Sequence, residues 1–524
     1  MTEDKSRSAA FLVGAGILLS RIAGLVRQKV FAYYFSTSLA ADAFNAAFRI
    51  PNLLQNLLGE GVLSASFIPE YVRFIAKGND EEADRLSGAV LATLALVASL
   101  VVLAGVLLAP LLVGLIAPGF TGEKRDLTVR LTQILFPGAG LFVFSAWCLG
   151  ILNSHRQFFL SYTAPVMWNI AVIGALVMFG RSSSQPQLAE WMAWASVVGS
   201  GLQFLVQLPL VLRLTHGLHL NLDFRSASTR NVFRNFVPAF ISRGVVQISA
   251  FIDAFIASWL PTGAIATLAY AQVLYTLPVS LFGMAVTAAE LPVMSSAVGT
   301  PEEVAGYLRG RLDGGLERIA FFIIPSAVAM LALGDVLSAI FFESGKFTRA
   351  DSIWVWQVMA GSTIGLLAST WGRLYSSTFY AMQDTRTPLR YALVRVALTS
   401  VLGYFAALHL PSLLGVDPRL GVAGLTTTAG IAGWVEFFLL RREMSRRIGP
   451  TSMPPSLILK LWSAAGLAAA GAWGLKLSQS SNHTFWMSIA VIAAYGVIYL
   501  VTTTFMGISE ATAMTSRLTR RIAR

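Results

Sequence analysis

The chain alternates long apolar segments with short polar connections from one end to the other. Segments such as residues 86–117 and 484–507 contain runs of about 20 apolar residues, enough to cross a hydrocarbon layer of roughly 30 Å as helices. Windows of this kind predict about fourteen spans. They lie near residues 9–34, 39–72, 86–117, 127–152, 158–180, 188–213, 232–260, 264–296, 315–342, 352–381, 388–410, 419–441, 456–476 and 484–507. We therefore expect an all-α integral membrane protein.

Composition supports lipid as the solvent of this chain. Of 524 residues, 55% are hydrophobic and only 13% are charged, which is too little polar surface to coat a soluble particle of this size. The N-terminal segment has no small-residue cleavage pattern and is interpreted as a retained first span rather than a removed signal peptide. The single cysteine, Cys148, excludes an internal disulfide framework and a cysteine-cluster metal site.

The pattern of spans also suggests an internal repeat. The sequence GVLSASFIPEY at the end of the second span resembles MAVTAAELPVMS at the end of the eighth, with Pro69 aligned on Pro292. Repeats six spans apart have the same orientation, so two pseudo-symmetric six-helix lobes should be related by an axis along the membrane normal, with a binding site between them. We expect residues 1–225 to form the first lobe, 226–445 the second, and 446–524 two further spans and a basic tail.

The net charge of +12 reports topology rather than nucleic-acid binding. Assigning alternate connections to the cytoplasm, beginning with the N-terminus, places about 24 Lys and Arg on that side and about 8 on the other. Both termini are therefore predicted to be cytoplasmic. No nucleic-acid fingerprint accompanies the basic clusters, which are interpreted as topology signals and contacts with anionic lipid.

Charged residues inside the predicted spans are the main functional candidates, because a charge in hydrocarbon is costly. They are Arg21, Arg27 and Lys29 in the first span, Asp42, Arg49 and Glu60 in the second, and Arg243, Asp253 and Glu290 in the seventh and eighth. On an unbroken helix the charges of the second span would share one stripe and face a water-lined cavity. Arg21 and Arg27 would share a face only if the helix broke at Gly24; the alternative places Arg27 near an interface.

The excess of arginine among these residues predicts an anionic ligand. The guanidinium forms two charge-assisted hydrogen bonds with phosphate oxygens and stays protonated when partly desolvated, which suits a diphosphate. Asp42 and Glu60 would orient the arginines and partly neutralise them when the ligand is absent.

Enzyme and metal templates are not matched. The five histidines are scattered, and only His216 and His219 are close enough to suggest a ligand pair, with no carboxylate pair nearby. There is no Walker A loop, dinucleotide fingerprint or HExxH motif. We therefore expect no catalytic residues, no metal site and no cofactor.

Several long motifs in a fixed order carry a family resemblance. They are SRIAGLVRQ in the first span, ADAFNAAFRIPNLLQNLLGEGVLSASFIPEY in the second, LIAPGF after the third, ILNSHRQF after the fourth, FESGKFT after the ninth and FYAMQDTRTP after the tenth. Over nearly its whole length the chain resembles the MurJ (MviN) family of lipid II flippases, within the multidrug, oligosaccharidyl-lipid and polysaccharide exporter superfamily.

The resemblance implies fourteen helices, with two six-helix lobes in a V around a cationic cavity that opens alternately to either side. The implied cargo is lipid II, an undecaprenyl-pyrophosphate-linked disaccharide-pentapeptide of peptidoglycan synthesis, carried from the inner to the outer leaflet of the bacterial inner membrane. The implied partners are lipid II and membrane lipids, with the cell-wall synthesis machinery as a further candidate.

Matched residue by residue, Arg21, Arg27, Asp42, Arg49 and Glu60 fall where the family has its cavity charges. Three positions depart from the family pattern, namely Gln28, Gln55 and Val273, where an acid, an arginine and a cavity arginine are usual. We hypothesise that Arg243 replaces the charge missing from the eighth span.

Coupling and cargo leave alternatives open. Asp253 falls where some members have a sodium-site aspartate, and Glu290 is a second candidate coupling residue, so sodium, protons and membrane potential are all candidate driving forces. The competing functions are export of another lipid-linked oligosaccharide and, because the cavity helices carry arginines instead of acids, less favourably drug or cation antiport. A non-transporting scaffold would leave the intramembrane charges unexplained.

Overall fold

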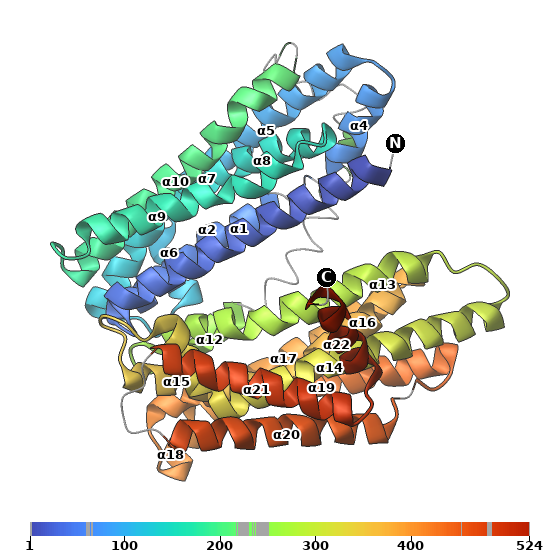
Figure 1. The fold of residues 1–524 in the computed structure, drawn as a ribbon. Coiled ribbons are helices and arrows are strands. Elements are labelled where there is room, and N and C mark those ends of the chain that lie inside the picture. The colour runs from blue at the N-terminus through green and yellow to red at the C-terminus, as the bar shows by residue number, and fades with distance from the viewer. Residues whose placement is uncertain are drawn as a thin grey trace. The chain divides into compact units, whose positions relative to one another are not determined.

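The computed structural model consists of helices, which fall by their contacts into two units. It describes residues 3–58, 63, 66–215, 217, 230–232, 234, 236, 251–451, 453–478 and 485–522. The N-terminal unit comprises residues 1–266 with 344–346, and the C-terminal unit comprises 267–343 with 347–524. Every regular element within the described residues is a helix (Figure 1). The predicted fold class is thus confirmed.

The N-terminal unit is built around one buried helix. Its helices are α1 (Glu3–Phe35), α2 (Leu39–Leu58), α4 (Ile68–Ala76), α5 (Asp80–Leu107), α6 (Ala109–Ile116), α7 (Gly122–Ser154), α8 (Phe158–Thr163), α9 (Pro165–Phe179) and α10 (Gln185–Leu214). α7 packs against α2, α5 and α10, and 78% of the 18-residue apolar stretch by which it qualifies as a membrane span is buried. An α-helix this apolar and this enclosed serves as the core of the unit.

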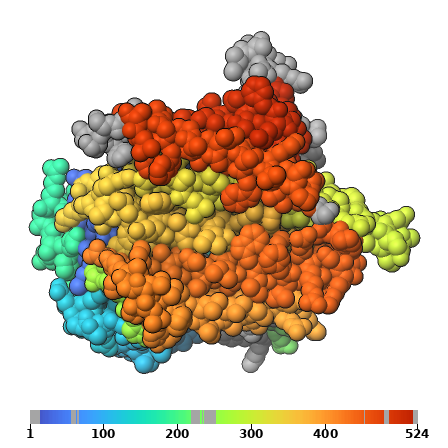
Figure 2. All heavy atoms as spheres, turned by 90° about the horizontal axis from the view of Figure 1, so that it is seen from below, coloured from blue at the N-terminus to red at the C-terminus, as the bar shows by residue number. Residues whose placement is uncertain are grey.

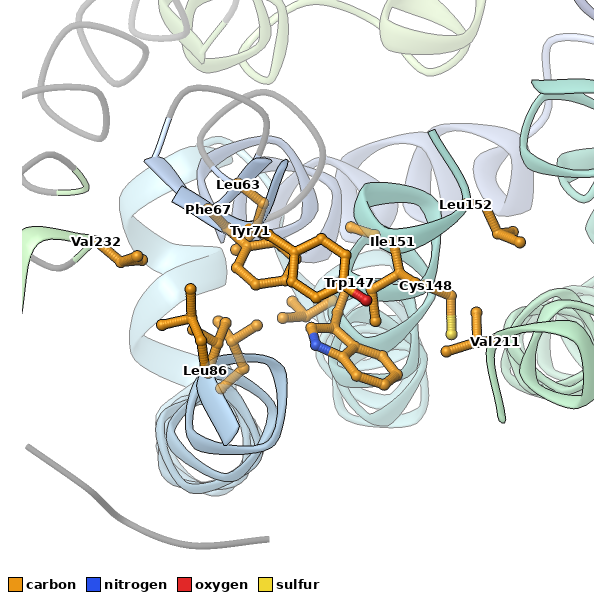
Figure 3. Close-up of a cluster of buried hydrophobic side chains, with 14 of the residues drawn as sticks. Leu63, Phe67, Tyr71, Leu86, Trp147, Cys148, Ile151, Leu152, Val211 and Val232 are labelled. Carbon is orange, nitrogen blue, oxygen red and sulfur yellow. The ribbon is translucent and has the colours of Figure 1, made fainter. Parts of the chain in front are cut away.

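Aromatic side chains fill the unit where α4, α5 and α7 meet. Trp147 is fully buried, and its indole N–H donates to the carbonyl of Ser87 at 3.2 Å. Figure 3 shows Trp147 and Tyr71 pointing into the same cluster, with Leu86 beside them. Phe67 approaches α7 closely at Gly150, where an added Cβ would lie 3.3 Å from its ring. The motif that contains Phe67 and Tyr71 therefore has a packing role.

The C-terminal unit has an equivalent central helix, α14 (Pro301–Phe342), of whose corresponding apolar stretch 67% is buried. The other helices are α12 (Ala264–Pro278), the π-helix η1 (Val279–Met284), α13 (Ala285–Ser295), α15 (Arg349–Thr363), α16 (Leu366–Ala381), α17 (Arg386–Leu408), α18 (Leu410–Leu414), the 3₁₀ turn η2 (Pro418–Leu420), α19 (Gly421–Ile448), α20 (Pro455–Leu477), α21 (Phe485–Phe505) and α22 (Ser509–Ile522). α14 packs against α15, α16, α20 and α21.

Where α14 is distorted, side chains of neighbouring helices donate hydrogen bonds to its backbone carbonyls. Pro325 has no N–H, which frees the carbonyl of Phe321 four residues earlier. The hydroxyl of Tyr499 donates to that carbonyl at 2.7 Å, and Tyr495 donates to the carbonyl of Pro325 at 2.7 Å. α21 is thus fastened to α14 by two hydrogen bonds, and the proline makes the one to Phe321 available.

A second distortion lies at Leu333, whose φ of −126° and ψ of 19° are not helical. The indole of Trp473 donates to the carbonyl of Ala332 at 2.7 Å, and that of Trp356 donates to the carbonyl of Leu331 at 3.0 Å. These donors come from α20 and α15. Carbonyls at an irregular position inside a membrane protein need such partners, because lipid offers none.

The two last spans, whose packing the sequence left undecided, lie against this central helix. α20 buries a face of small residues that includes Ala464, Ala468 and Ala472. Small residues let helices approach closely in lipid. Figure 2 shows α20 and α21, in dark orange and red, lying along the yellow α14, as their contacts require.

Ten helices over the described residues are long and apolar enough to cross a membrane, and they correspond to predicted spans three to six, eight, nine and eleven to fourteen. α1 and α2, at the first predicted span and the start of the second, are helical throughout their described lengths. The tenth predicted span is divided into α15 and α16 around Gly365. Gly365 packs against Gly430 of α19, and a Cβ added to Gly430 would lie 2.8 Å from the Gly365 nitrogen. Most of the seventh predicted span lies outside the described residues.

Two motifs six spans apart end their helices in the same way. After α7, Arg156 has a φ of +61°, and the Gln157 N–H donates to the carbonyl of Leu152 at 2.8 Å. After α16, Gln383 has a φ of +60°, and the Asp384 N–H donates to the carbonyl of Phe379 at 2.9 Å. Both are left-handed caps closed by a six-to-one hydrogen bond. This local agreement fits the expected repeat, although Pro69 begins α4 whereas Pro292 lies inside α13.

The expected boundary after residue 225 falls outside the described residues. By contacts, the segment 251–266 goes with the N-terminal unit instead of with the second lobe. One reason is that Gly119 lies close to the backbone of this segment at Ser258. The N–H of Gly119 donates to the hydroxyl of Ser258 at 3.1 Å. A second reason is the side chain of Asp42, described below.

Candidate functional site

Arg27 is held on the face of α1 that packs against α9. Its Nε donates to Oδ1 of Asn169 at 3.0 Å, and its guanidinium carbon lies 4.8 Å from the ring centroid of Trp168. The Asn169 amide is oriented because its nitrogen donates to the carbonyl of Pro165 at 3.0 Å. Arginine has five N–H donors, and Asn169 uses one of them. A stacked, oriented guanidinium of this kind is suited to bind a phosphate oxygen pair.

An aromatic stack continues from Arg27 toward α2. Trp168 lies 5.6 Å from Phe48 between ring centroids, and its indole N–H donates to Ser196 at 2.8 Å. Phe48 stacks in turn on Phe44 at 6.0 Å. The ring that supports Arg27 is therefore fixed by hydrogen bonding and by packing.

α1 continues unbroken through Gly24, so the expected break that would bring Arg21 and Arg27 together is absent. The six residues between the two arginines correspond to about 240° around a helix, which separates them. Arg21 is exposed and Arg27 is half-buried. Gln28, at the position where an acid is usual in the family, is buried.

Asp42 lies at the junction of α2, α7 and the start of α12. It is fully buried, and its carboxylate accepts from Nζ of Lys124 at 2.6 Å and from the backbone N–H groups of Gly263 at 2.7 Å and Ala266 at 2.8 Å. Lys124 also lies 4.0 Å from the ring centroid of Phe120. An acid beside the first N–H groups of a helix is favourable, since it satisfies donors that have no partner within the helix.

These contacts correct one expectation for Asp42. The sequence suggested that Asp42 orients the cavity arginines, but its oxygens bind a lysine and backbone amides. Arg49, seven residues later on α2, interacts electrostatically with Asp253 in the same segment 251–266. In this structure the Asp42 end of the stripe faces protein, so the prediction of a water-lined face does not hold there.

The start of α12 is one of two distant segments fastened to the N-terminal unit. The other contains the FESGKFT motif, in which the Lys346 N–H donates to the carbonyl of Tyr33 near the end of α1 at 2.9 Å. Gly345 has a φ of +59°, and an added Cβ would lie 2.6 Å from that carbonyl oxygen. Only glycine satisfies both conditions. The motif thus caps the C-terminal end of α1.

Glu290 lies on α13, buried, and binds two arginines of α14. Its carboxylate accepts from Arg311 at 2.6 Å and from Arg318 at 3.0 Å. The sequence had placed Arg311 in a polar connection, but α14 begins at Pro301 and carries it on a helix. Two cations share one carboxylate here, so the cluster formed by these three residues has a positive balance that could bind an anion.

Several candidates are not placed by the structure. Glu60 and Arg243 lie outside the described residues, so the replacement proposed for Arg243 stays a prediction. Gln55 and Val273, the other two departures from the family pattern, are half-buried. Among the described residues no group of three histidine, cysteine or acidic side chains is suited to hold a metal ion.

The sequence as a whole matches the family described as lipid II flippase MurJ over residues 31–514. A probable lipid II flippase MurJ of Rhizobium tropici is 34% identical over 444 residues, which cover 83% of this chain and 80% of that protein. A lipid II flippase MurJ of Burkholderia cenocepacia is 32% identical over 446 residues, covering 84% of each.

Solved structures agree on the fold. A lipid II flippase MurJ in an inward closed conformation superimposes with a TM-score of 0.77 and 23% identity, covering 95% of this chain and 98% of that one. An inward-facing multidrug resistance MATE transporter of the MOP superfamily gives a TM-score of 0.65 and 17% identity, covering 80% and 95%.

Proposed function

We propose, from the premise that the chain belongs to the lipid II flippase MurJ family, that it carries lipid II from the inner to the outer leaflet of the bacterial cytoplasmic membrane for peptidoglycan synthesis. The family match over residues 31–514 is the observation that carries this conclusion. The chain is accordingly a multi-pass transporter whose substrate moves without a change in covalent structure.

Arg27 is the proposed contact for the pyrophosphate of the cargo. Its guanidinium is oriented by Asn169 and stacked on Trp168, which lowers the entropy lost when it binds. Bidentate hydrogen bonding to a pyrophosphate oxygen pair would use the donors that Asn169 does not occupy. The exposed Arg21 is the second proposed cation on α1.

A second anion-binding group is proposed in the C-terminal unit. Arg311 and Arg318 share the carboxylate of Glu290, and the Arg318 side chain is 52% exposed. Because it is the more exposed of the two, Arg318 can turn toward an anion while Arg311 keeps Glu290 paired.

Both candidate coupling carboxylates are paired with arginines. Asp253 interacts with Arg49, and Glu290 with two arginines. A sodium ion and a proton would each have to compete with an arginine for either carboxylate, because a nearby positive charge favours the ionised form. Sodium, protons and the membrane potential all stay candidate driving forces, and the transport test compares them.

The test is transport by the purified chain in sealed vesicles. Fluorescent lipid II is incorporated, and its accessibility on each leaflet is measured with and without a pH gradient, a sodium gradient or a membrane potential. We expect lipid II transfer that is lost in Arg27→Gln and reduced in Arg27→Lys, because lysine cannot form the bidentate contact.

Arg181→Gln provides a matched control, because Arg181 lies exposed in the connection after α9. Equal activity of both glutamine variants would remove Arg27 from the binding site. Transfer of a lipid-linked oligosaccharide of the O-antigen type, in the absence of lipid II transfer, would reassign the cargo.

The orientation and the cell-wall partners belong to the same proposal. Both termini are proposed to be cytoplasmic from the distribution of basic residues, and contact with the peptidoglycan synthesis machinery is proposed through the basic tail. The single native cysteine, Cys148, is buried. A cysteine introduced at the C-terminus of a Cys148→Ser chain should therefore react with an impermeant maleimide only in inside-out vesicles.

A further inference from the structure

A half-open cavity of about 90 Å³ lies in the C-terminal unit, where the middle of α16 and the C-terminal half of α19 meet the start of α20. Its walls come from four helices and from the connection between α19 and α20. The lining residues are Leu316, Trp371, Tyr375, Phe437, Arg441, Thr451, Met453 and Ile458. None of them belongs to the candidate transport site.

Three aromatic rings form the wall, those of Trp371, Tyr375 and Phe437. The polar atoms of the tryptophan and the tyrosine are hydrogen-bonded within the protein. The indole of Trp371 donates to the carbonyl of Leu316 at 3.2 Å, and the hydroxyl of Tyr375 bonds with that of Thr451 at 2.7 Å. Phe437 packs against both rings, with centroids 5.4 Å from Trp371 and 5.6 Å from Tyr375. The cavity therefore offers ring faces and aliphatic groups to an occupant, and its shape is fixed by hydrogen bonds.

One cation stands at this apolar cavity. Nη2 of Arg441 donates to the carbonyl of Thr451 at 3.2 Å, which holds the exposed guanidinium against the connection that borders the cavity. Neighbouring basic residues are engaged differently: Arg446 and Arg447 bind Glu443, at 3.4 and 3.3 Å. No acidic residue lines the cavity. Arginine beside an apolar wall is suited to an amphiphile with a negative head.

The cavity lies at a membrane boundary. α19 ends at Ile448 and α20 begins at Pro455, and both helices are long and apolar enough to span the bilayer. A site between the end of one span and the start of the next is at the depth of lipid head groups. The basic residues at the end of α19 assign that boundary to the cytoplasmic leaflet, where anionic lipids gather basic side chains.

We propose that this cavity is a binding site for an anionic phospholipid of the cytoplasmic leaflet. The phosphodiester accepts hydrogen bonds from Arg441, and the glycerol ester with the first methylenes of an acyl chain lies against Trp371, Tyr375 and Phe437. A volume of about 90 Å³ equals roughly three water volumes, so it holds a few methylene-sized groups of the lipid and leaves the rest of the acyl chain in the bilayer.

Other ligands fit the same surface less well. An aromatic cage binds quaternary ammonium groups, but Arg441 at this one would repel a cation. Inorganic phosphate would pair with Arg441 yet gain nothing from the rings. The lipid alone uses both the charge and the apolar wall.

The proposal is tested on the full chain in detergent by native mass spectrometry, titrating phosphatidylglycerol, phosphatidylethanolamine with the same acyl chains, and glycerol 3-phosphate. We expect one phosphatidylglycerol to bind tightly, with weaker binding of the zwitterionic lipid and none of glycerol 3-phosphate. Arg441→Gln should weaken phosphatidylglycerol binding by about tenfold, the effect of one charge-assisted contact. It should weaken phosphatidylethanolamine binding less, because the ammonium of that lipid already offsets the charge of its phosphodiester.

Two further variants separate the cavity from general surface charge. Arg442→Gln removes an equal charge from the next residue, which does not line the cavity, and should change binding less than about twofold. Ile458→Trp should fill the cavity and weaken both lipids. Equal losses in the two arginine variants would overturn the proposal in favour of diffuse attraction, and unchanged binding in Ile458→Trp would show that the cavity is only a packing void. Thermal unfolding of each lipid-free variant verifies that it is folded.

Discussion

The carboxylate of Asp42 should determine how firmly the start of α12 is held to α2 and α7. The perturbation is Asp42→Asn, which keeps the size of the side chain and removes its charge. The single amide oxygen can accept at most two hydrogen bonds, whereas the two carboxylate oxygens accept three, from Lys124, Gly263 and Ala266. The amide nitrogen, itself a donor, would face other donors.

The magnitude follows from burial. Asp42 is 0% exposed, and the Lys124 side chain only 12%. A buried N–H left without a partner costs about 1–3 kcal/mol, and breaking a buried ion pair from one side costs about 3–5 kcal/mol. These terms overlap, because all three donors share one carboxylate. We therefore expect a local destabilisation of about 3 kcal/mol, equivalent to roughly a hundredfold increase in local opening.

Hydrogen exchange followed by mass spectrometry is the appropriate assay, because it reports on individual segments. Exchange at the amides of Gly263 and Ala266 should accelerate by roughly that hundredfold in Asp42→Asn, while the α5–α7 core of the same unit stays protected. Asp126→Asn is the matched control, since Asp126 lies exposed two residues from Lys124. Unchanged protection at Gly263 and Ala266 would refute the reasoning, as would equal acceleration in the control.

Three further predictions concern thermal unfolding in detergent. Tyr499→Phe leaves the buried carbonyl freed by the proline of α14 without its donor and should cost about 1–3 kcal/mol, unlike Tyr307→Phe at an exposed position. Hydrogen bonds from the side chain and backbone of Thr387 lower the pKa of Asp384 below its ordinary 3.8, so its contribution is complete above that pH and is lost as the pH falls through the lower folded value. Asp384→Asn should thus cost about 1 kcal/mol at neutral pH, and a difference that did not shrink in acid would contradict this cause. Gly345→Ala should cost about 1–3 kcal/mol, because it needs both a positive φ and space beside a carbonyl, and an unchanged midpoint would disprove that requirement.

That the chain is a membrane-spanning helical protein could be predicted from the sequence, because this property depends on local composition. A run of apolar residues crosses lipid as a helix whatever surrounds it, since backbone groups in hydrocarbon must bond within the segment. For this reason predicted spans such as 188–213 and 456–476 lie close to α10 and α20. Local composition did not predict the break at Gly365, where close packing on Gly430 divides one predicted span into α15 and α16.

The candidate residues could be chosen from the sequence, but their partners could not. Charges in apolar segments are visible in one dimension, because their cost in lipid does not depend on the fold. Which group neutralises each charge depends on segments far apart in the chain. Asp42 meets Lys124 and the start of α12, more than 80 residues and more than 200 residues away, as the separations of 82 and 221 show.

The sequence by itself thus determined the solvent of this protein, its helical class and its family, because these follow from apolar length and from motifs read in order. Only the tertiary structure decided that Asp42 caps a helix, that Arg27 stacks on Trp168, and that Glu290 is shared by Arg311 and Arg318. The physical reason is that a buried charge takes whatever partner the packing of helices brings within hydrogen-bonding distance.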